Sequence, residues 1–209
     1  KKGTFYLRTL EDAKGIISIL KDVNDVAILG GGLIGMRAAY SLRKQNKKVH
    51  VIVKSSHIFS QILDFESADM LRSQLEKNGV EINSGLEAVE ISGKDKVEAI
   101  GLDDGNKLDC QLVIIGKGVS PNSDMLSGKV KANYGIMVNE NLRTSDDAIF
   151  ASGDVAEAYD ILEEKTTINA IWPAAVRQGR IAGLNMAGKN TIYEGSCGMN
   201  SVEFFGMSV

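Results

Sequence analysis

Apolar and polar positions in the first half of the chain follow two periodicities, which predict strands joined by a helix. Residues 25–30 (DVAILG) are a short apolar run typical of a buried strand, and residues 48–53 (KVHVIV) form a valine-rich second strand. The intervening residues 31–48 have helical periodicity, so the three elements predict one βαβ unit. Four side chains are expected on the apolar face of this helix: Ile34, Ala38, Ala39 and Leu42.

A second helix and a third strand are predicted next. Asp64 is a suitable N-cap and Gly79 a suitable C-terminal stop, so the helix is expected between them. Residues 79–84 (GVEINS) are expected to form the third strand, and His50 alternates with valines as a sheet-face residue. The apolar face of the second helix is predicted to contain Phe65, Ala68, Leu71 and Leu75.

The pattern changes after residue 85. Short alternating segments between residues 85 and 110 are separated by turn signals, which favours an antiparallel meander, and residues 111–116 (QLVIIG) return to a buried parallel strand. Residues 135–154 predict two short strands, and residues 157–172 are expected to be irregular. Further predictions are a helix over 173–188, with Pro173 in its first turn, and a single strand over 200–209.

Composition narrows the class of protein without identifying it. The chain has 209 residues, 44% apolar and 24% charged, which is typical of a globular protein of one or two domains. The net charge is −3, and basic and acidic residues are interspersed along the chain without forming blocks. Neither a nucleic acid nor an anionic membrane is therefore expected as a partner. No apolar run approaches the roughly 20 residues that span a bilayer, and no signal peptide is expected.

The cysteines give a weak indication of compartment. Cys110 and Cys197 lie far apart and outside any CxxC spacing, so neither a disulfide framework nor a zinc site is predicted, and a reducing cytoplasm is expected. Cys110 is expected to be a small core or sheet residue. The chain begins at Lys1, not Met, and we expect it to be a piece of a longer protein.

The glycine spacing of residues 30–35 predicts a dinucleotide-binding loop. Gly30, Gly32 and Gly35 have G-x-G-x-x-G spacing after a predicted strand and at the start of a predicted helix. The first glycine is expected to permit the turn, the second to let the backbone approach a pyrophosphate, and the third to let the helix pack on the strand. The helix N-terminus adds free N–H groups and a positive dipole end. A glycine-rich turn without a ligand is the alternative.

The residues after the second strand bear on cofactor choice. An NAD site usually places an acid about 20 residues beyond the glycine loop, but here Val53 is followed by Lys54, Ser55 and Ser56. Lys54 and the serine hydroxyls suit a 2′-phosphate, so a slight preference for NADPH is predicted; a solvated surface lysine is the alternative. His57 is expected to be an ordinary loop histidine.

Several motifs, in order and over nearly the whole chain, resemble the FAD-dependent pyridine nucleotide-disulfide oxidoreductases. The similar branch comprises NADH oxidases, coenzyme A disulfide reductases, rubredoxin reductases and nitrite reductase flavoproteins. The segments that carry the resemblance are FYLRTLEDAKGI, VAILGGGLIG, LVIIGKGVSPN, LRTSDDAIFASGD, WPAAVRQGRIAGLNMAG and YEGSCGMNSVEFFGMSV.

The resemblance implies two cofactor sites. Asp154 would bind the ribityl chain of FAD, Gly153 would permit close approach, and the backbone at Trp172 and Ala174 would donate to the flavin N1/O2 edge. Hydride would pass from nicotinamide C4 to N5 of the oxidised flavin, and the dipole of that helix would stabilise the anionic reduced flavin that forms. The residues expected at the NAD(P) site are Gly30, Gly32, Leu33, Ile34, Gly35, Val53, Lys54, Ser55 and Gly116.

The resemblance also implies an α/β fold: a Rossmann-like NAD(P)-binding domain with a parallel sheet and a β-meander, plus the C-terminal half of an FAD-binding domain. The first FAD-binding glycine loop and the redox-cysteine region of the family have no counterpart in this sequence. The expected division is a segment leading from the FAD domain (1–23), the NAD(P) domain (24–118), half of the FAD domain (119–190) and the start of an interface domain (191–209).

Two functions are therefore predicted, in order of preference. The first is an NAD(P)H-dependent flavoprotein oxidoreductase, a homodimer that passes electrons to a disulfide, oxygen or a redox partner protein; this chain alone would bind nucleotide without turnover. The alternative is a non-catalytic nucleotide-binding or regulatory module. It is favoured only by the missing acid at Val53 and by Arg37, which stands where many relatives have a glutamate near the nicotinamide. Arg37 would either alter the local field or lie on the surface without a role.

Overall fold

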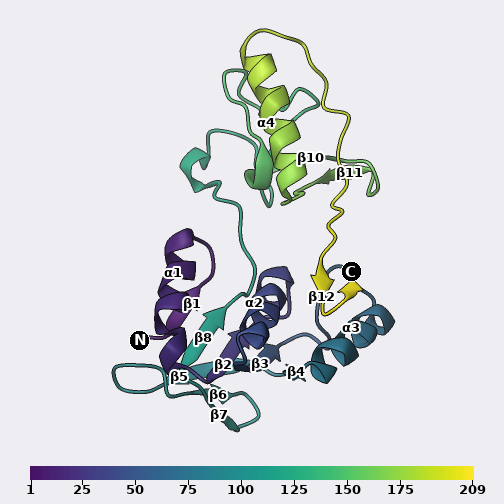
Figure 1. Ribbon diagram of the computed structural model, residues 1–209. Coiled ribbons are helices and arrows are strands. Elements are labelled where there is room, and N and C mark those ends of the chain that lie inside the picture. The colour runs from purple at the N-terminus through teal and green to yellow at the C-terminus, as the bar shows by residue number, and fades with distance from the viewer. The chain divides into compact units, whose positions relative to one another are not determined.

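The period-two pattern of the central strand gives each face of the sheet its own apolar layer. In the computed structural model, which describes residues 1–209, five parallel strands are ordered β1–β8–β2–β3–β4 (Figure 1). Val26 and Ile28 of β2 lie in one layer, whereas Ala27 and Leu29 lie in the other. The strand bounds are β1 Thr4–Tyr6, β2 Asp25–Leu29, β3 Lys48–Val53, β4 Val80–Ser84 and β8 Leu112–Ile115.

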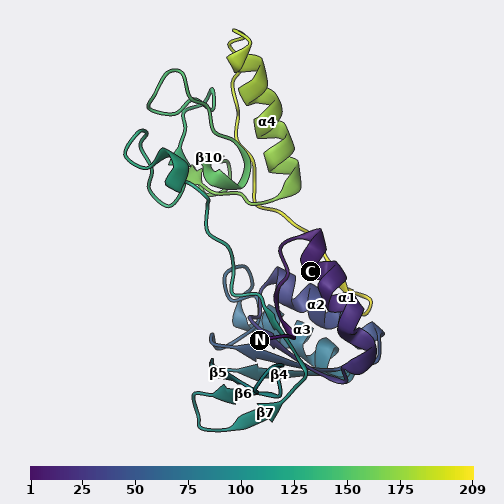
Figure 2. The same ribbon diagram turned by 90° about the vertical axis from the view of Figure 1, so that its left-hand side faces the viewer.

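Helices cover one face of this sheet and a meander covers the other (Figures 1 and 2). The helices are α1 (Leu10–Ile19, continued by the 3₁₀ turn η1, Leu20–Asp22), α2 (Leu33–Lys44) and α3 (Phe65–Lys77). The antiparallel meander consists of β5 (Ala88–Ser92), β6 (Ala99–Leu102) and β7 (Lys107–Asp109). The parallel sheet and the meander predicted from the sequence are therefore confirmed.

Both predicted helices form, but α2 ends at Lys44, before the predicted end at residue 48, and two predicted face residues in the first turns are exposed. Asp64 caps α3 by accepting a 2.8 Å hydrogen bond from the Ser67 N–H. Ile34 and Phe65 were expected on buried faces, but their side chains are 40% and 65% exposed. Both lie in the first turn of their helix, and the Phe65 ring packs edge-on against His57. The remaining predicted face residues are buried: Ala38, Ala39, Leu42, Ala68, Leu71 and Leu75.

The chain forms two compact units. Unit 1 contains Lys1–Gly118 and Val202–Val209, and unit 2 contains Val119–Ser201. Residues 1–23, which the sequence suggested as a segment leading from another domain, lie in unit 1, where β1 pairs with β8. Residues 191–201 lie in unit 2, whereas 202–209 lie in unit 1. No helix in either unit combines the length and apolar composition that crossing a membrane requires.

The end of the chain is a hairpin, not the single strand predicted over 200–209. Its strands are β12 (Glu203–Phe204) and β13 (Met207–Ser208). The two residues between them, Phe205 and Gly206, have φ of 51° and 83°, as tight two-residue hairpin turns require. Phe204 is fully buried in the same apolar cluster as α2 and α3.

Unit 2 differs from its predicted pattern at two places. Residues 157–172 were expected to be irregular, but most of them lie in the hairpin β10 (Ala156–Asp160) and β11 (Lys165–Thr167) or start α4. The Asp160 carboxylate closes the hairpin turn by accepting the Leu162 and Glu163 N–H groups. Two strands were expected within 135–154, but only β9 (Ile136–Met137) forms, and the second is reduced to a bridge between Arg143 and Phe150. Other elements are η2 (Asp124–Leu126), η3 (Gly153–Val155) and α4 (Trp172–Met186), which includes the predicted Pro173 in its first turn.

Candidate functional site

The carboxyl ends of three parallel strands converge on the glycine loop of unit 1. The Gly30 N–H donates to the Ile52 carbonyl at 2.9 Å, and the Gly116 N–H donates to the Leu29 carbonyl at 2.8 Å. Gly30 has a φ of 122°, and a Cβ there would collide with the Gly116 carbonyl oxygen. A Cβ at Gly35 would likewise collide with the Gly30 carbonyl oxygen. These two glycines are required by backbone packing alone.

Gly32 differs, because a Cβ there would meet nothing within 4 Å. It is the N-cap of α2, and no side chain caps the helix. The first turn contains no acidic residue, so the N–H groups of Leu33 and Ile34 have neither an intrahelical acceptor nor a competing carboxylate. An open approach to an uncapped helix N-terminus fits a phosphate group. Phosphate binding by these residues remains a prediction.

The strand tip places Val53 and Lys54 in different environments. The Val53 side chain is 3% exposed and lies where a Cβ at Gly31 would touch it, so it packs under the glycine loop. The Lys54 side chain is 77% exposed, but its Nζ lies 2.7 Å from Oε2 of Glu87. The sequence had suggested either a lysine available for a 2′-phosphate or a solvated surface lysine. In the structure Lys54 is exposed and also ion-paired with Glu87.

The loop after Lys54 is organised by its own polar groups. The Ser55 hydroxyl donates to the His57 carbonyl at 2.9 Å, and the Ser56 hydroxyl lies 3.0 Å from His57 Nδ1. His57 Nε2 lies 3.2 Å from the Leu63 carbonyl oxygen. His57 is thus an ordinary loop histidine, as predicted, and the hydroxyl of Ser55 retains lone pairs but no free proton.

Arg37 has a role that neither sequence alternative included. Its Nη1 donates to the Glu203 carbonyl at 3.1 Å, and its guanidinium lies over the rings of Tyr40 and Phe204, at 5.3 and 6.0 Å from their centroids. Arg37 therefore binds the C-terminal hairpin to α2. The local sequence gave no signal of this, because its partners in the hairpin, Glu203 and Phe204, follow it by 166 residues or more.

Two remaining sequence predictions concern buried residues of the sheet. His50 is buried in β3, with its Nδ1 2.9 Å from the Glu81 carboxylate on the neighbouring strand β4. Cys110 is fully buried in the layer beneath the meander, and burial raises the pKa of its thiol to about 11. Both are structural residues, as expected.

In unit 2, the predicted flavin-binding residues meet at the start of α4. Gly153 has a φ of 77°, and a Cβ there would lie 3.5 Å from the Ala175 side chain, so the η3 turn lies against the first turn of this helix. No side chain caps α4, which leaves the Trp172 and Ala174 N–H groups without intrahelical acceptors. Asp154 is exposed beside this helix terminus. The arrangement fits the carbonyl edge and hydroxyl chain of a flavin; their binding here remains a prediction.

A buried polar network that sequence reasoning missed fixes the Gly153 turn. The Gln178 side chain, 1% exposed, accepts the Gly153 N–H at 2.7 Å and donates to the Tyr193 hydroxyl at 3.1 Å. That hydroxyl donates to Ser196 Oγ at 2.6 Å, which in turn accepts from the Asn169 amide. A signal existed, because Gln178 shares helical spacing with the buried residues Ala174, Ile181 and Asn185.

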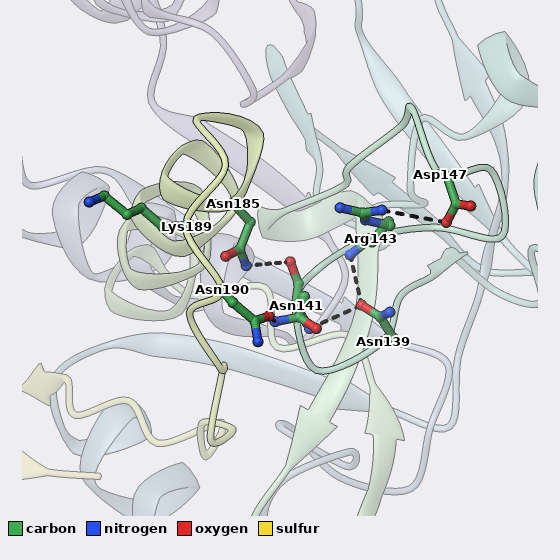
Figure 3. Close-up of a pocket in the computed structure, with 7 residues that line it drawn as sticks. All are labelled: Asn139, Asn141, Arg143, Asp147, Asn185, Lys189 and Asn190. Atoms are coloured by element: carbon green, nitrogen blue, oxygen red, sulfur yellow. Dashed lines mark hydrogen bonds and ion pairs between the residues drawn. The ribbon is translucent and has the colours of Figure 1, made fainter.

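One hollow of unit 2 is lined by four asparagines and three charged residues: Asn139, Asn141, Asn185, Asn190, Arg143, Asp147 and Lys189. It has a volume of about 310 Å³ and lies at the far end of α4 (Figure 3). The Asn185 amide donates to the Asn141 carbonyl at 2.8 Å, and Arg143 lies 3.5 Å from Asp147 (Figure 3). These groups bind one another and the 139–147 loop, so the hollow is explained as a structural network.

Comparison with known proteins decides the family. A family model described as pyridine nucleotide-disulphide oxidoreductase matches residues 1–179. The chain belongs to this family. The resemblance inferred from the motifs is therefore confirmed.

The chain matches about half, or less, of three similar proteins. An NADH oxidase of Methanocaldococcus jannaschii is 35% identical over 190 residues, which cover 89% of this chain and 42% of that protein. A NAD-dependent persulfide reductase from A. fulgidus has a TM-score of 0.92 and 26% identity, covering 98% of this chain and 38% of that one. A FAD-dependent pyridine nucleotide-disulphide oxidoreductase from Desulfovibrio vulgaris has a TM-score of 0.85 and 30% identity, covering 97% and 53%. The chain thus spans about half the length of these relatives, or less.

Proposed function

We propose that this chain is the nicotinamide-nucleotide-binding portion of an NAD(P)H-dependent flavoprotein oxidoreductase. The observation that carries the proposal is the open, uncapped N-terminus of α2 at Gly32, in a chain that belongs to a family of such enzymes. Under this proposal the N–H groups of Leu33 and Ile34 bind the pyrophosphate, and Gly30, Gly35 and Gly116 shape the turn that presents them.

We further propose that unit 2 supplies half of a flavin site. Asp154 would accept hydrogen bonds from the ribityl hydroxyls, Gly153 would allow their close approach, and the Trp172 and Ala174 N–H groups would donate to the pyrimidine edge. The positive end of the α4 dipole favours negative charge at that edge. When bound, FAD takes hydride from the nicotinamide and passes electrons to an acceptor.

The electron acceptor stays open between a disulfide, oxygen and a redox partner protein. The names of the relatives include an oxidase and a persulfide reductase, so both classes occur among similar proteins. We also propose that the parent protein is a homodimer that works in the cytoplasm, because two free cysteines without a disulfide are typical of a reducing compartment.

A slight preference for NADPH over NADH is the finer part of the proposal. Val53 offers no acceptor for a ribose 2′-hydroxyl, and the cationic Nζ of Lys54 lies at the tip of the same strand. The Ser55 hydroxyl can still accept a hydrogen bond beside it. The alternative of a module without redox chemistry loses one of its two supports, because Arg37 is now explained by its contact with Glu203.

Calorimetric titration of the chain with NADH and with NADPH tests the proposal. A Gly32→Val substitution places its side chain in open space, so the fold should remain, while the approach of a pyrophosphate is blocked. We expect at least a tenfold loss of affinity for both nucleotides, a factor that corresponds to about 1.4 kcal/mol.

Gly183→Val is the matched control, because a Cβ there also meets nothing within 4 Å. Gly183 lies on the exposed face of α4 in unit 2, away from the glycine loop in the sequence and in a different unit. It should bind both nucleotides like the unaltered chain. If neither nucleotide binds, or if Gly32→Val binds as tightly as the control, the proposed site is wrong.

A further inference from the structure

A bridge of three charged side chains lies at the carboxyl edge of the sheet in unit 1. Glu87 Oε2 lies 2.7 Å from the Nζ of Lys54, and its Oε1 accepts a 2.9 Å hydrogen bond from the Nζ of Lys117. Lys54 follows β3 and Lys117 follows β8, the strands on either side of β2. Both lysines thus share one carboxylate at the edge where the glycine loop also lies.

The backbone holds Glu87 at this place. The Gly85 N–H donates to the Ser55 carbonyl at 3.0 Å, and the Leu86 N–H donates to the Val53 carbonyl at 3.2 Å, so the segment before Glu87 is tied to the tip of β3. The Glu87 N–H itself donates to Asp103 Oδ1 at 3.0 Å. These three hydrogen bonds hold the backbone of Glu87 at the tip of β3, within reach of both lysines.

The charge state of the bridge is also fixed. Hydrogen bonds from Lys54 and Lys117 lower the pKa of Glu87 to about 2, so the carboxylate is ionised at any pH at which a nucleotide is studied. Its side chain is 29% exposed, whereas that of Lys54 is 77% exposed. A ligand phosphate can therefore approach Lys54 from solvent, whereas Glu87 is less accessible.

A lysine with a carboxylate partner is a weaker receptor for a phosphate. The 2′-phosphate of NADPH carries a charge of about −1.5 to −2 at pH 7, so it is attracted by Lys54 and repelled by the Glu87 carboxylate that is paired with this lysine. NADH has no charge at that position, and its binding is insensitive to this balance.

We propose that Glu87 is a specificity-determining residue, which weakens NADPH binding by competing with the 2′-phosphate for Lys54. This inference rests on the proposed nucleotide site and deepens it. The residues that indicated the cofactor in the sequence, Val53 and Lys54, lie at the end of β3, whereas Glu87 lies after β4. The inference is that Glu87 sets how strongly NADPH is preferred.

Calorimetric titration of the whole chain with NADPH and with NADH tests the inference. Glu87→Gln keeps the side-chain shape and removes the charge, and it should tighten NADPH binding about three- to tenfold while NADH affinity stays within twofold. Glu90→Gln is the matched control. Glu90 is an exposed residue of β5 that forms no ion pair with a lysine, so its substitution makes the same change in net charge and should alter neither affinity.

Lys54→Gln and the double variant with Glu87→Gln show whether the effect passes through Lys54. We expect Lys54→Gln to weaken NADPH binding. In that background, Glu87→Gln should not increase the affinity for NADPH.

An unchanged NADPH-to-NADH affinity ratio in Glu87→Gln, with both nucleotides still bound, overturns this inference alone. Equal tightening of both nucleotides also overturns it, because that indicates a general charge effect. Absence of nucleotide binding by the unaltered chain overturns the proposed function and this inference together.

Discussion

Gln178 joins two parts of unit 2 through one buried amide. Its carbonyl oxygen accepts the Gly153 N–H and its amino group donates to the Tyr193 hydroxyl, so removing the amide leaves the Gly153 N–H without its partner and takes from the Tyr193 hydroxyl one of its two hydrogen bonds. A buried polar group without a partner costs about 1–3 kcal/mol. The position of the turn before Asp154 therefore depends on a side chain from the second turn of α4.

At the residue scale, we predict that Gln178→Met destabilises unit 2 by about 1–3 kcal/mol, because the methionine fills the space but pairs with neither group. Denaturant unfolding followed by the fluorescence of Trp172, the only tryptophan, measures this change in unit 2.

Tyr193→Phe and the double variant complete a thermodynamic cycle. Because Gln178 and Tyr193 share a hydrogen bond, their effects should be non-additive by at least about 0.5 kcal/mol. Purely additive effects would mean that the network does not act as a unit.

Residue-scale prediction from sequence succeeded where the signal was local. The glycine spacing at Gly30, Gly32 and Gly35 located the turn and the contact of Gly35 with the Gly30 carbonyl, because these are local, whereas the close approach of Gly30 to Gly116 was not visible in the spacing. The partner of Lys54 was not predictable, since Glu87 lies 33 positions later and is brought to it by the pairing of β3 with β4. Long-range ion pairs follow from the folded topology and leave no local pattern.

At the element scale, the N-terminus of α3 depends on Asp64, whose carboxylate accepts the Ser67 N–H. We predict that Asp64→Ala destabilises unit 1 by about 0.5–2 kcal/mol, the usual cost of losing an N-cap, and that Asp64→Asn, which keeps an acceptor oxygen, costs much less. Chemical denaturation monitored by far-ultraviolet circular dichroism measures both changes.

Asp69→Ala is the matched control for the cap, because it removes an exposed aspartate from the interior of the same helix. Its effect should lie within about 0.5 kcal/mol of zero. Equal destabilisation by the two alanine variants would show that the loss of negative charge, and not the cap, is responsible.

Elements were predictable where side-chain periodicity decided them and were missed where side chains compete for the backbone. Asp160 turns the chain between β10 and β11 by accepting two N–H groups, so an irregular-looking sequence becomes a hairpin. Asn139 does the reverse, because it accepts the Asn141 and Arg143 N–H groups and leaves a single bridge where a strand was expected. Neither outcome follows from hydrophobic pattern alone.

At the scale of the whole molecule, the chain leaves unit 1 at Gly118 and returns to it at Val202. The returning hairpin brings Phe204 into the main apolar cluster, where it contacts Tyr40 and Phe59 at ring-centroid distances of 6.1 and 6.0 Å. Gln74 of α3 donates to the Phe205 carbonyl at 2.7 Å, which fixes the same hairpin from the other helix. Unit 1 is thus completed by eight residues from the end of the chain.

Phe204→Ala should therefore destabilise unit 1 by about 3–5 kcal/mol, the usual cost of removing a fully buried aromatic side chain. Hydrogen exchange of the β2 and β3 amides should accelerate accordingly, since these strands share the cluster with Phe204. Phe65→Ala is the matched control in the same unit; its ring is 65% exposed and its loss should cost less than about 1 kcal/mol. If the two variants exchange alike, the hairpin is not part of the core. Arg37 of α2, the helix that follows the glycine loop, contacts Glu203 of the hairpin. If Phe204→Ala weakens nucleotide binding and Phe65→Ala does not, the stability of the glycine loop depends on the returning segment.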